Sequence, residues 1–331
     1  MRNIKNISEK RYLIDYANIQ AGIIKYQKNF LNEDQFYDFV KNAYKGFPLL
    51  LPLGLKSFDY SNCKSFFFIN KNFFYKKIYL INNRRKINYL DKIINIPEWY
   101  CTGAVLKEKF KKYVKTIIRQ NLRIKNKIYS LKKKFSNLIA FQTRNIPHYG
   151  HQKIIEYLLS RFNCVIINPL TGMKKKGDVK SNILEKIFRI LIKNNYSKRN
   201  IFYLPIIANF FYAGPRESLH HLNLREMLGF TNFIIGRDHA GVGKIYNPLD
   251  AYNFCKKYKK KFIIKPFLTK GAYYSKISKT VEINKKKTKK NSIINISGTV
   301  FRSYIRKKKI YSFASPLLQE YIHKIKNKIF Y

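Results

Sequence analysis

The sequence predicts an α/β fold in which a doubly wound parallel sheet forms the centre of the protein. Two observations support this class. From Leu138 onward, short apolar runs alternate with segments of helical spacing, and this alternation implies crossover connections between parallel strands. The chain also has 331 residues, of which 46% are hydrophobic, enough for a sizeable core.

Each element of this sheet is expected from its own pattern. Leu138–Gln142 is a short buried strand, and apolar residues recur at helical spacing from Ile154 to Leu159. The remaining strands and helices are expected, in alternation, at Cys164–Asn168, Asn182–Asn194, Ile201–Leu204, Arg216–Met227, Phe233–Ile235, Pro248–Tyr258 and Phe262–Ile264.

The first hundred or so residues show no such alternation. Short runs such as Leu49–Leu53 and Lys77–Ile81 lie between Asn-rich and Lys-rich turns, which indicates a mixed, strand-rich module. The charged stretch Tyr113–Phe135 is typical of a surface helix or linker and forms a natural boundary. We therefore expect an N-terminal domain over 1–113, a central α/β domain over 114–265 and a small C-terminal segment over 266–331 that completes it.

The chain is strongly basic, with 67 Lys and Arg against 18 Asp and Glu, a formal charge of +49. This excess raises a nucleic-acid-binding function as an alternative. The Lys residues, however, accompany abundant Ile, Asn, Tyr and Phe, all of which have A- and T-rich codons, so we interpret the charge as largely mutational bias. The four cysteines show no metal-binding spacing and predict reduced thiols in a cytoplasmic protein. No apolar run reaches the roughly 20 residues that span a bilayer, so no membrane association is expected.

Two polar loops follow the first and fourth expected strands, at 142–151 and 236–243. Ligands of open parallel sheets bind at the carboxyl ends of the strands, so both loops are expected at one edge. His148 and His151 share a face at the start of a helix and, with Arg144 and Asn145, form a donor cluster suited to phosphate oxygens. The alternative is that one histidine caps the helix and the other packs in the core. Neither loop is a P-loop.

The segment His148-Tyr-Gly-His151 resembles the HxGH signature of nucleotidylyltransferases, and Ile296–Arg302 resembles their second signature. Further motifs extend the resemblance to the ATP sulfurylase family over about 138–302; they are Gln142–Asn145, Asn168–Asp178, Ala213–Glu217, His220–His221 and Gly236–Gly241. The resemblance implies a PUA-like N-terminal domain, a small C-terminal α/β segment and a homo-oligomer.

The same resemblance implies roles for individual residues. Residues expected to be catalytic are Thr143, Arg144, Asn145, His148 and His151. Residues expected to contact ATP are Gln142, Thr143, Arg144, Asn145, Gly236, Arg237, Asp238 and His239. Residues expected to bind sulfate are Gln142, Arg144 and Ala240.

The implied reaction joins ATP and sulfate to give adenylyl sulfate and pyrophosphate, reversibly, with Mg²⁺ entering with ATP. No protein metal ligand is expected, and no structural zinc, because Tyr274–Lys276 contains no Cys where some relatives have a zinc site. No specific nucleic acid is an expected partner. Two alternatives remain: another adenylyltransferase of the same superfamily, acting on a nucleotide or phosphopantetheine, and a basic nucleic-acid-binding protein.

Overall fold

The structure, a computed structural model, describes part of the chain, with the central α/β region covered almost continuously. The described residues are 7–25, 65–68, 99–102, 108–174, 176–211, 214–241, 246–283, 292–325 and 329–331. The expected strands at Leu49–Leu53 and Lys77–Ile81 lie outside these residues.

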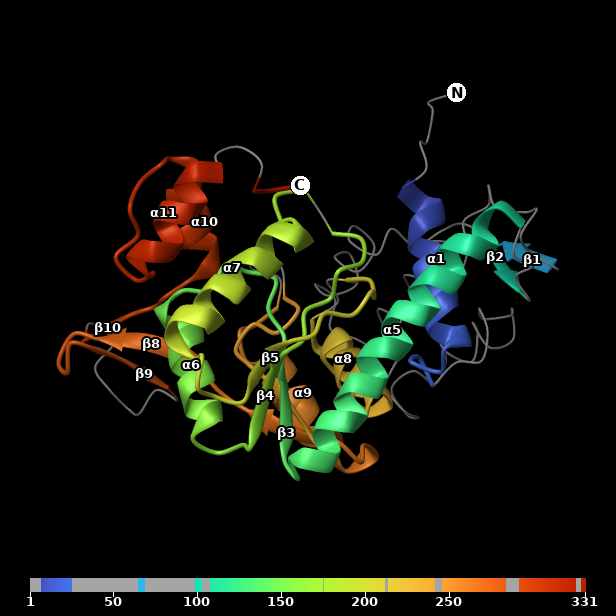
Figure 1. Ribbon diagram of the computed structural model, residues 1–331, viewed down its shortest axis with the longest axis horizontal. Helices are drawn as coiled ribbons and strands as arrows, with labels where there is room; N and C mark the ends of the chain where they lie inside the picture. Colours follow the sequence, from blue (N-terminus) through green and yellow to red (C-terminus); the bar gives the residue numbers. More distant parts are fainter. Residues whose placement is uncertain are drawn as a thin grey trace.

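A five-stranded parallel sheet forms the centre of the molecule (Figure 1). Its strands, in the spatial order β5-β4-β3-β6-β7, are Ile201–Tyr203, Cys164–Ile167, Leu138–Phe141, Asn232–Ile235 and Lys265–Leu268. The chain moves outward from β3 to β5 and then crosses back to β6 and β7. The α/β fold with a parallel sheet flanked by helices is therefore confirmed, and the direction of winding reverses at β3.

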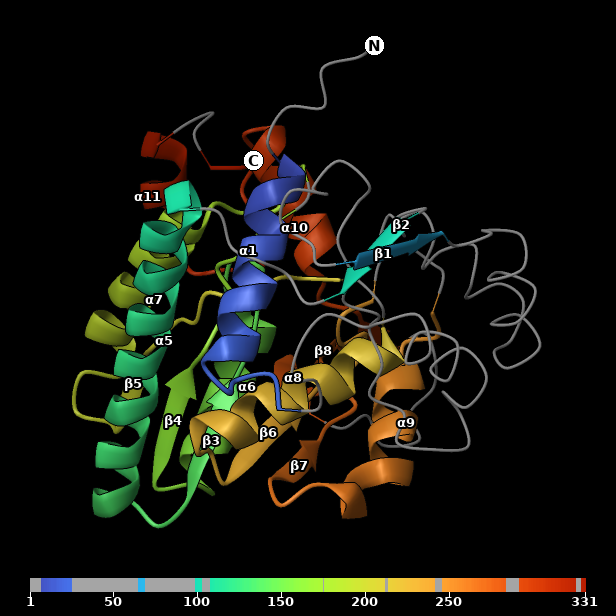
Figure 2. The ribbon, with the colours of Figure 1, turned by 90° about the vertical axis from the view of Figure 1, so that its right-hand side faces the viewer.

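Alternate side chains of the strands enter two separate cores, one on each face of the sheet. Leu138 and Ala140 of β3 pack into one core, and Ile139 and Phe141 pack into the other. Helices cover both faces (Figure 2). They are α6 (Tyr149–Leu159), α7 (Ser181–Asn195), α8 (Pro215–Leu228) and α9 (Asp250–Tyr258). All four fall where helices are expected from the sequence.

Helix α8 shows how local sequence fixes an element that borders the site. Pro215 occupies its first turn, where a missing N–H costs no helical hydrogen bond. Gly229 ends it with a φ of 95°, a left-handed conformation that favours glycine. Phe230 N–H then donates to Arg225 O at 3.1 Å, which closes the last turn.

The last strand of the sheet differs from its prediction. The apolar run Phe262–Ile264 was expected to form it, but β7 begins at Lys265 and pairs with Asn232 of β6. The Glu226 carboxylate accepts the N–H groups of Ile263 and Ile264 at 2.7 and 3.1 Å. These N–H groups are therefore bonded to a side chain rather than to a neighbouring strand.

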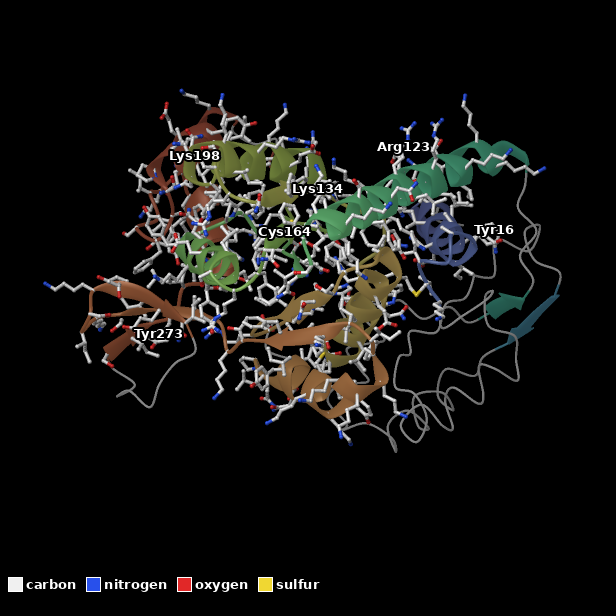
Figure 3. All side chains as sticks on the ribbon, turned by 60° about the horizontal axis from the view of Figure 1, so that its bottom comes forward. Tyr16, Arg123, Lys134, Cys164, Lys198 and Tyr273 are labelled. Atoms are coloured by element: carbon white, nitrogen blue, oxygen red, sulfur yellow. The ribbon has the colours of Figure 1, made fainter. Side chains whose placement is uncertain are left out.

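The long helix α5 (Glu108–Lys134) occupies the charged stretch expected to be a helix or linker. Its apolar stripe, which includes Val114, Ile117 and Ile128, is buried. Exposed Arg123 and Lys134 project from its outer side (Figure 3).

Helix α1 (Ile7–Gln20) packs against α5 and was not expected. Its Asn18 is buried and donates to Ile207 O at 2.9 Å. Ile19, and Ile23 just beyond the helix, belong to the same core as Leu138 of the sheet. The N-terminal residues thus contact the α/β core directly.

The C-terminal residues form a smaller layer beside α6 and α7 (Figure 1). Its three antiparallel strands, in the spatial order β10-β8-β9, are Ile293–Ile294, Ala272–Ser275 and Thr280–Ile283. Its two helices are α10 (Gly298–Arg306) and α11 (Pro316–Ile325).

A separate antiparallel pair joins β1 (Ser65–Phe68) to β2 (Trp99–Thr102). None of the helices in the described ranges is long and apolar enough to cross a bilayer.

Candidate active site

The loop after β3 forms one wall of a pocket at the carboxyl edge of the sheet. Arg144 Nη2 donates to the carbonyl oxygen of Gly241 at 2.9 Å, although the two residues are far apart in the chain. Within the loop, Thr143 Oγ1 accepts the N–H of Asn145 at 3.1 Å. The first loop is therefore bonded both to itself and to the loop after β6, as expected for segments that converge at one edge.

The two histidines of this loop form a close pair with tilted rings at the start of α6. His148 is the N-cap, its ring centroid lies 3.9 Å from that of His151, and its N–H donates to His151 Nδ1 at 3.3 Å. Because His151 Nδ1 accepts this bond, the proton of the neutral ring is on Nε2, which lies 3.3 Å from Thr143 Oγ1. His148 occupies the N-cap position, the place that the alternative interpretation gives to one of the two histidines.

Both histidines are neutral near pH 7. Burial lowers the pKa of His151 to about 4. The pKa of His148 is well below its ordinary value, first because of burial and next because of the neighbouring His151. A neutral imidazole offers an N–H donor rather than a positive charge, and a donor of this kind suits contact with an oxyanion.

The loop after β6 forms the opposite wall. Asp238 and Ala240 have φ values of 56° and 55°, a left-handed conformation that is unfavourable for residues other than glycine. The N–H of Asp238 donates to Pro248 O at 2.7 Å, and Ala240 O accepts from Gly214 N–H at 3.1 Å. Strained backbone retained by specific hydrogen bonds is a feature of ligand-binding loops.

A third wall comes from the start of α10. Ser297 caps this helix by accepting the N–H of Thr299 at 3.2 Å. Arg302 Nη1 donates to Asn145 Oδ1, and Arg302 Nη2 donates to Thr299 Oγ1 at 3.2 Å. A Cβ at Gly298 would lie 2.7 Å from Asn145 Cγ, so only glycine permits this close approach. The Ile296–Arg302 motif identifies this segment in the sequence but does not indicate which residues its side chains contact.

These walls enclose a cavity of about 240 Å³. Three arginines, Arg144, Arg237 and Arg302, line it, and Asp238 is the one carboxylate among the described lining residues. Such a surplus of cations and N–H donors suits an anionic ligand. All eleven residues singled out from the sequence lie in its walls; these are Gln142, Thr143, Arg144, Asn145, His148, His151, Gly236, Arg237, Asp238, His239 and Ala240.

Behind the pocket, buried polar residues of α8 contact both loops. Glu217 and His221 are fully buried, and His221 Nε2 lies 3.1 Å from Glu217 Oε1. The other ring nitrogen, Nδ1, lies 3.2 Å from Gln142 Nε2 and 3.0 Å from His239 Nε2. The sequence places these residues in motifs but offers no sign of this contact, because α8 is remote in sequence from Gln142.

A buried cation supports the same region. Arg225 is fully buried. Its Nε donates to Asn168 Oδ1 at 2.9 Å, and its Nη2 donates to Asn168 O at 2.7 Å. Its guanidinium carbon lies 4.8 Å from the centre of the Phe233 ring.

A second cation, Lys174, lies in the Lys-rich loop that follows β4. It donates to Val179 O at 3.1 Å, and burial lowers its pKa to about 8. Neither side chain is among the described residues that line the cavity. The described part of the Asn168–Asp178 loop thus contacts α8 through Asn168 and lies outside the cavity lining.

Comparisons with known proteins agree with this geometry. The chain is 27% identical over 315 residues to a sulfate adenylyltransferase of Thermococcus onnurineus, covering 88% of this chain and 82% of that protein. It is 35% identical over 184 residues to one of Staphylothermus marinus and 34% identical over 182 residues to one of Pyrococcus abyssi; each alignment covers 48% of the relative. These two alignments thus span about half of the relatives' length.

Among solved structures, the fold is similar to a hexameric APS kinase from Thiobacillus denitrificans, with a TM-score of 0.58 and 11% identity over 95% of this chain and 61% of that one. This likeness concerns the fold alone. A family model for ATP-sulfurylase matches residues 119–312, which include the three pocket walls and the buried α8 contacts. The chain therefore belongs to the ATP-sulfurylase family.

Proposed function

We propose that this chain transfers the adenylyl group of ATP to sulfate and releases pyrophosphate, in the pocket formed by the loops after β3 and β6. The observation that carries the proposal is the hydrogen bond from Arg144 to Gly241 O, 2.9 Å long. It joins the two loops so that Arg144 and Arg237 line one cavity. A tetrahedral dianion and a triphosphate can then be bound side by side.

Sulfate would be bound by Gln142, Arg144 and the backbone N–H of Ala240. The guanidinium of Arg144 is planar and always charged, so it matches two oxygens of a tetrahedral anion. ATP would contact the residues from Gln142 to Asn145 and from Gly236 to His239. Arg302, which is bonded to Asn145, is added to this set because it lines the same cavity.

The proposed step is an in-line displacement at the α-phosphorus. A sulfate oxygen forms a bond to phosphorus while the bond from phosphorus to the pyrophosphate oxygen breaks, and the electron pair leaves with pyrophosphate. Sulfate is already ionised at neutral pH, so no general base is required. Catalysis then depends on alignment and on stabilising charge on the phosphate oxygens.

The neutral His148 and His151 suit this role, since donors fixed by the fold do not need to reorient as charge develops. Mg²⁺, when bound with ATP, would neutralise charge on the triphosphate. Asp238 is the one carboxylate lining the cavity among the described residues, so the metal would be bound mainly by phosphate oxygens and water.

The domain organisation is a proposal too. Residues 266–331 would complete the catalytic unit, since Arg302 of α10 reaches the pocket. Residues 1–113 would form a PUA-like domain, and the hexameric assembly named for the similar solved structure makes a homo-oligomer of this chain worth testing by light scattering.

The proposal is tested by supplying purified protein with Mg-ATP, pyrophosphatase and one acceptor at a time. We expect adenylyl sulfate with sulfate, and no adenylylated product with a mononucleotide or phosphopantetheine. Transfer to either of those acceptors at a rate above that with sulfate would favour another adenylyltransferase activity.

A further inference from the structure

The buried contact between α8 and the two loops has a defined donor and acceptor pattern. Glu217 Oε1 accepts the N–H of Phe211 at 2.9 Å and also lies 3.1 Å from His221 Nε2. An unprotonated ring nitrogen facing a carboxylate at this distance would be repelled. The proton of His221 therefore belongs on Nε2. The geometry of this pair is not that of an ideal hydrogen bond, but the short distance still favours a proton between the two groups.

With the proton on Nε2, the other nitrogen of His221 is an acceptor. Burial, together with nearby Arg225 and Arg144, lowers the pKa of His221 well below its ordinary value, so the ring is neutral. Its Nδ1 faces the amide nitrogen of Gln142 at 3.2 Å and Nε2 of His239 at 3.0 Å. The single lone pair of Nδ1 is thus shared between one residue of each substrate loop.

This acceptor determines which way the Gln142 amide points. An amide nitrogen carries two hydrogens; one is directed to His221, and the second remains for a ligand in the cavity that Gln142 lines. In the reverse orientation, the Gln142 oxygen would face the unprotonated Nδ1, and the two lone pairs would repel each other. The carboxylate of Glu217 therefore controls, through His221, whether Gln142 offers a donor or an acceptor to an anion.

We propose that Glu217 and His221 are positioning residues that orient the Gln142 amide as a donor to the bound sulfate and link the two substrate loops. This inference rests on the proposed function, because it takes sulfate to be the anion near Gln142. Neither residue touches substrate in this account. Gln142 and His239 also belong to the proposed ATP contacts, so we expect the larger effect on sulfate, the anion to which the oriented Gln142 amide donates.

A matched pair of substitutions at His221 separates this role from a structural one. His221→Asn places an amide oxygen near the position of Nδ1, within reach of Gln142. His221→Gln places its amide near the position of Nε2, facing Glu217 and away from Gln142. Both remove the ring and both introduce a carboxamide, so a role in packing alone predicts similar effects.

The assay is sulfate-dependent exchange of pyrophosphate into ATP by the full chain, with KM measured for each substrate. We expect His221→Gln to raise the KM for sulfate about tenfold, the loss associated with one misplaced hydrogen bond, and His221→Asn to remain within about threefold of wild type. The KM for ATP should change less than about threefold in both. Ser218→Ala, a buried change in the same helix that leaves this contact intact, is the control and should match wild type.

Equal KM values for sulfate in the two His221 variants would overturn the proposal. If neither variant shows a cooperative thermal transition, the same comparison is made with Glu217→Gln, which retains an acceptor oxygen, and Glu217→Met, which does not. A rise in the KM for sulfate with Met alone supports the proposal, and an equal rise with both overturns it. A wild-type chain without sulfate-dependent exchange refutes the proposed function instead, so the two failures are distinguishable.

Discussion

Replacement of Arg144 by lysine isolates the contribution of its planar guanidinium, because the charge is kept. Arg144 donates from Nη2 to Gly241 O at 2.9 Å and lines the cavity. A lysine ammonium cannot both keep this bond and present two parallel donors to an oxyanion. The change therefore removes about one charge-assisted hydrogen bond, on the order of 1.5–3 kcal/mol.

This loss corresponds to a decrease in kcat/KM for sulfate of roughly 10- to 150-fold, while Arg144→Ala should abolish measurable exchange. The assay is sulfate-dependent exchange of pyrophosphate into ATP at varied sulfate. Arg189→Lys is the matched control, because Arg189 pairs with Glu185 on an exposed helix face. A kcat/KM within threefold of wild type for Arg144→Lys would refute the assignment of Arg144 to sulfate.

Substitutions in the pocket and the buried histidines give three further predictions. His148→Ala should lower turnover by about 100-fold, as for loss of one transition-state donor, with little change in nucleotide affinity; weaker binding at unchanged turnover would contradict this. Gly298→Ala brings a methyl group to 2.7 Å from Asn145 Cγ, so kcat/KM for ATP should fall about tenfold without loss of the thermal transition, and normal kinetics would exclude a role for this contact. Burial lowers the pKa of His151 to about 4 and of His220 to about 3, below the roughly 6.5 of an unfolded chain, so only the unfolded chain gains their protons as pH falls. The free energy of unfolding should then decrease, as pH falls from 6.5 toward about 4, by up to about 1.4 kcal/mol per pH unit for each histidine, and equal urea midpoints at pH 7.5 and 5.5 would disprove this.

The central sheet could be predicted because its elements depend on local pattern. Strands such as Cys164–Ile167 are uniformly apolar, and α8 is bounded by Pro215 and Gly229. Strand β7 was misplaced because Glu226, more than 30 residues earlier, binds the N–H groups that the apolar run would otherwise use in the sheet.

Helix α1 was missed for a related reason. Two of its buried positions are polar, Asp15 and Asn18, which obscures the apolar period of a helix. Asp15 accepts from Asn209 Nδ2 at 2.8 Å, and Asn18 donates to Ile207 O at 2.9 Å. These partners are almost two hundred residues away, so no local pattern predicts them.

The pocket loops could be located from the sequence because the carboxyl ends of parallel strands share an edge. The contacts made by Glu217, His221 and Arg302 could not, since each depends on how a later helix packs against the first loop. Motif resemblance draws attention to such residues without indicating what they touch. The orientation of Gln142 is a property of the assembled site alone.

Exchange of labelled pyrophosphate into ATP, measured with and without sulfate, tests the central claim most directly. If the paired loops bind sulfate beside the α-phosphate of ATP, the full chain with Mg-ATP should exchange label only when sulfate is present, and the rate should saturate with sulfate. Exchange that is independent of sulfate, or none at any sulfate concentration in a folded protein, would contradict the account.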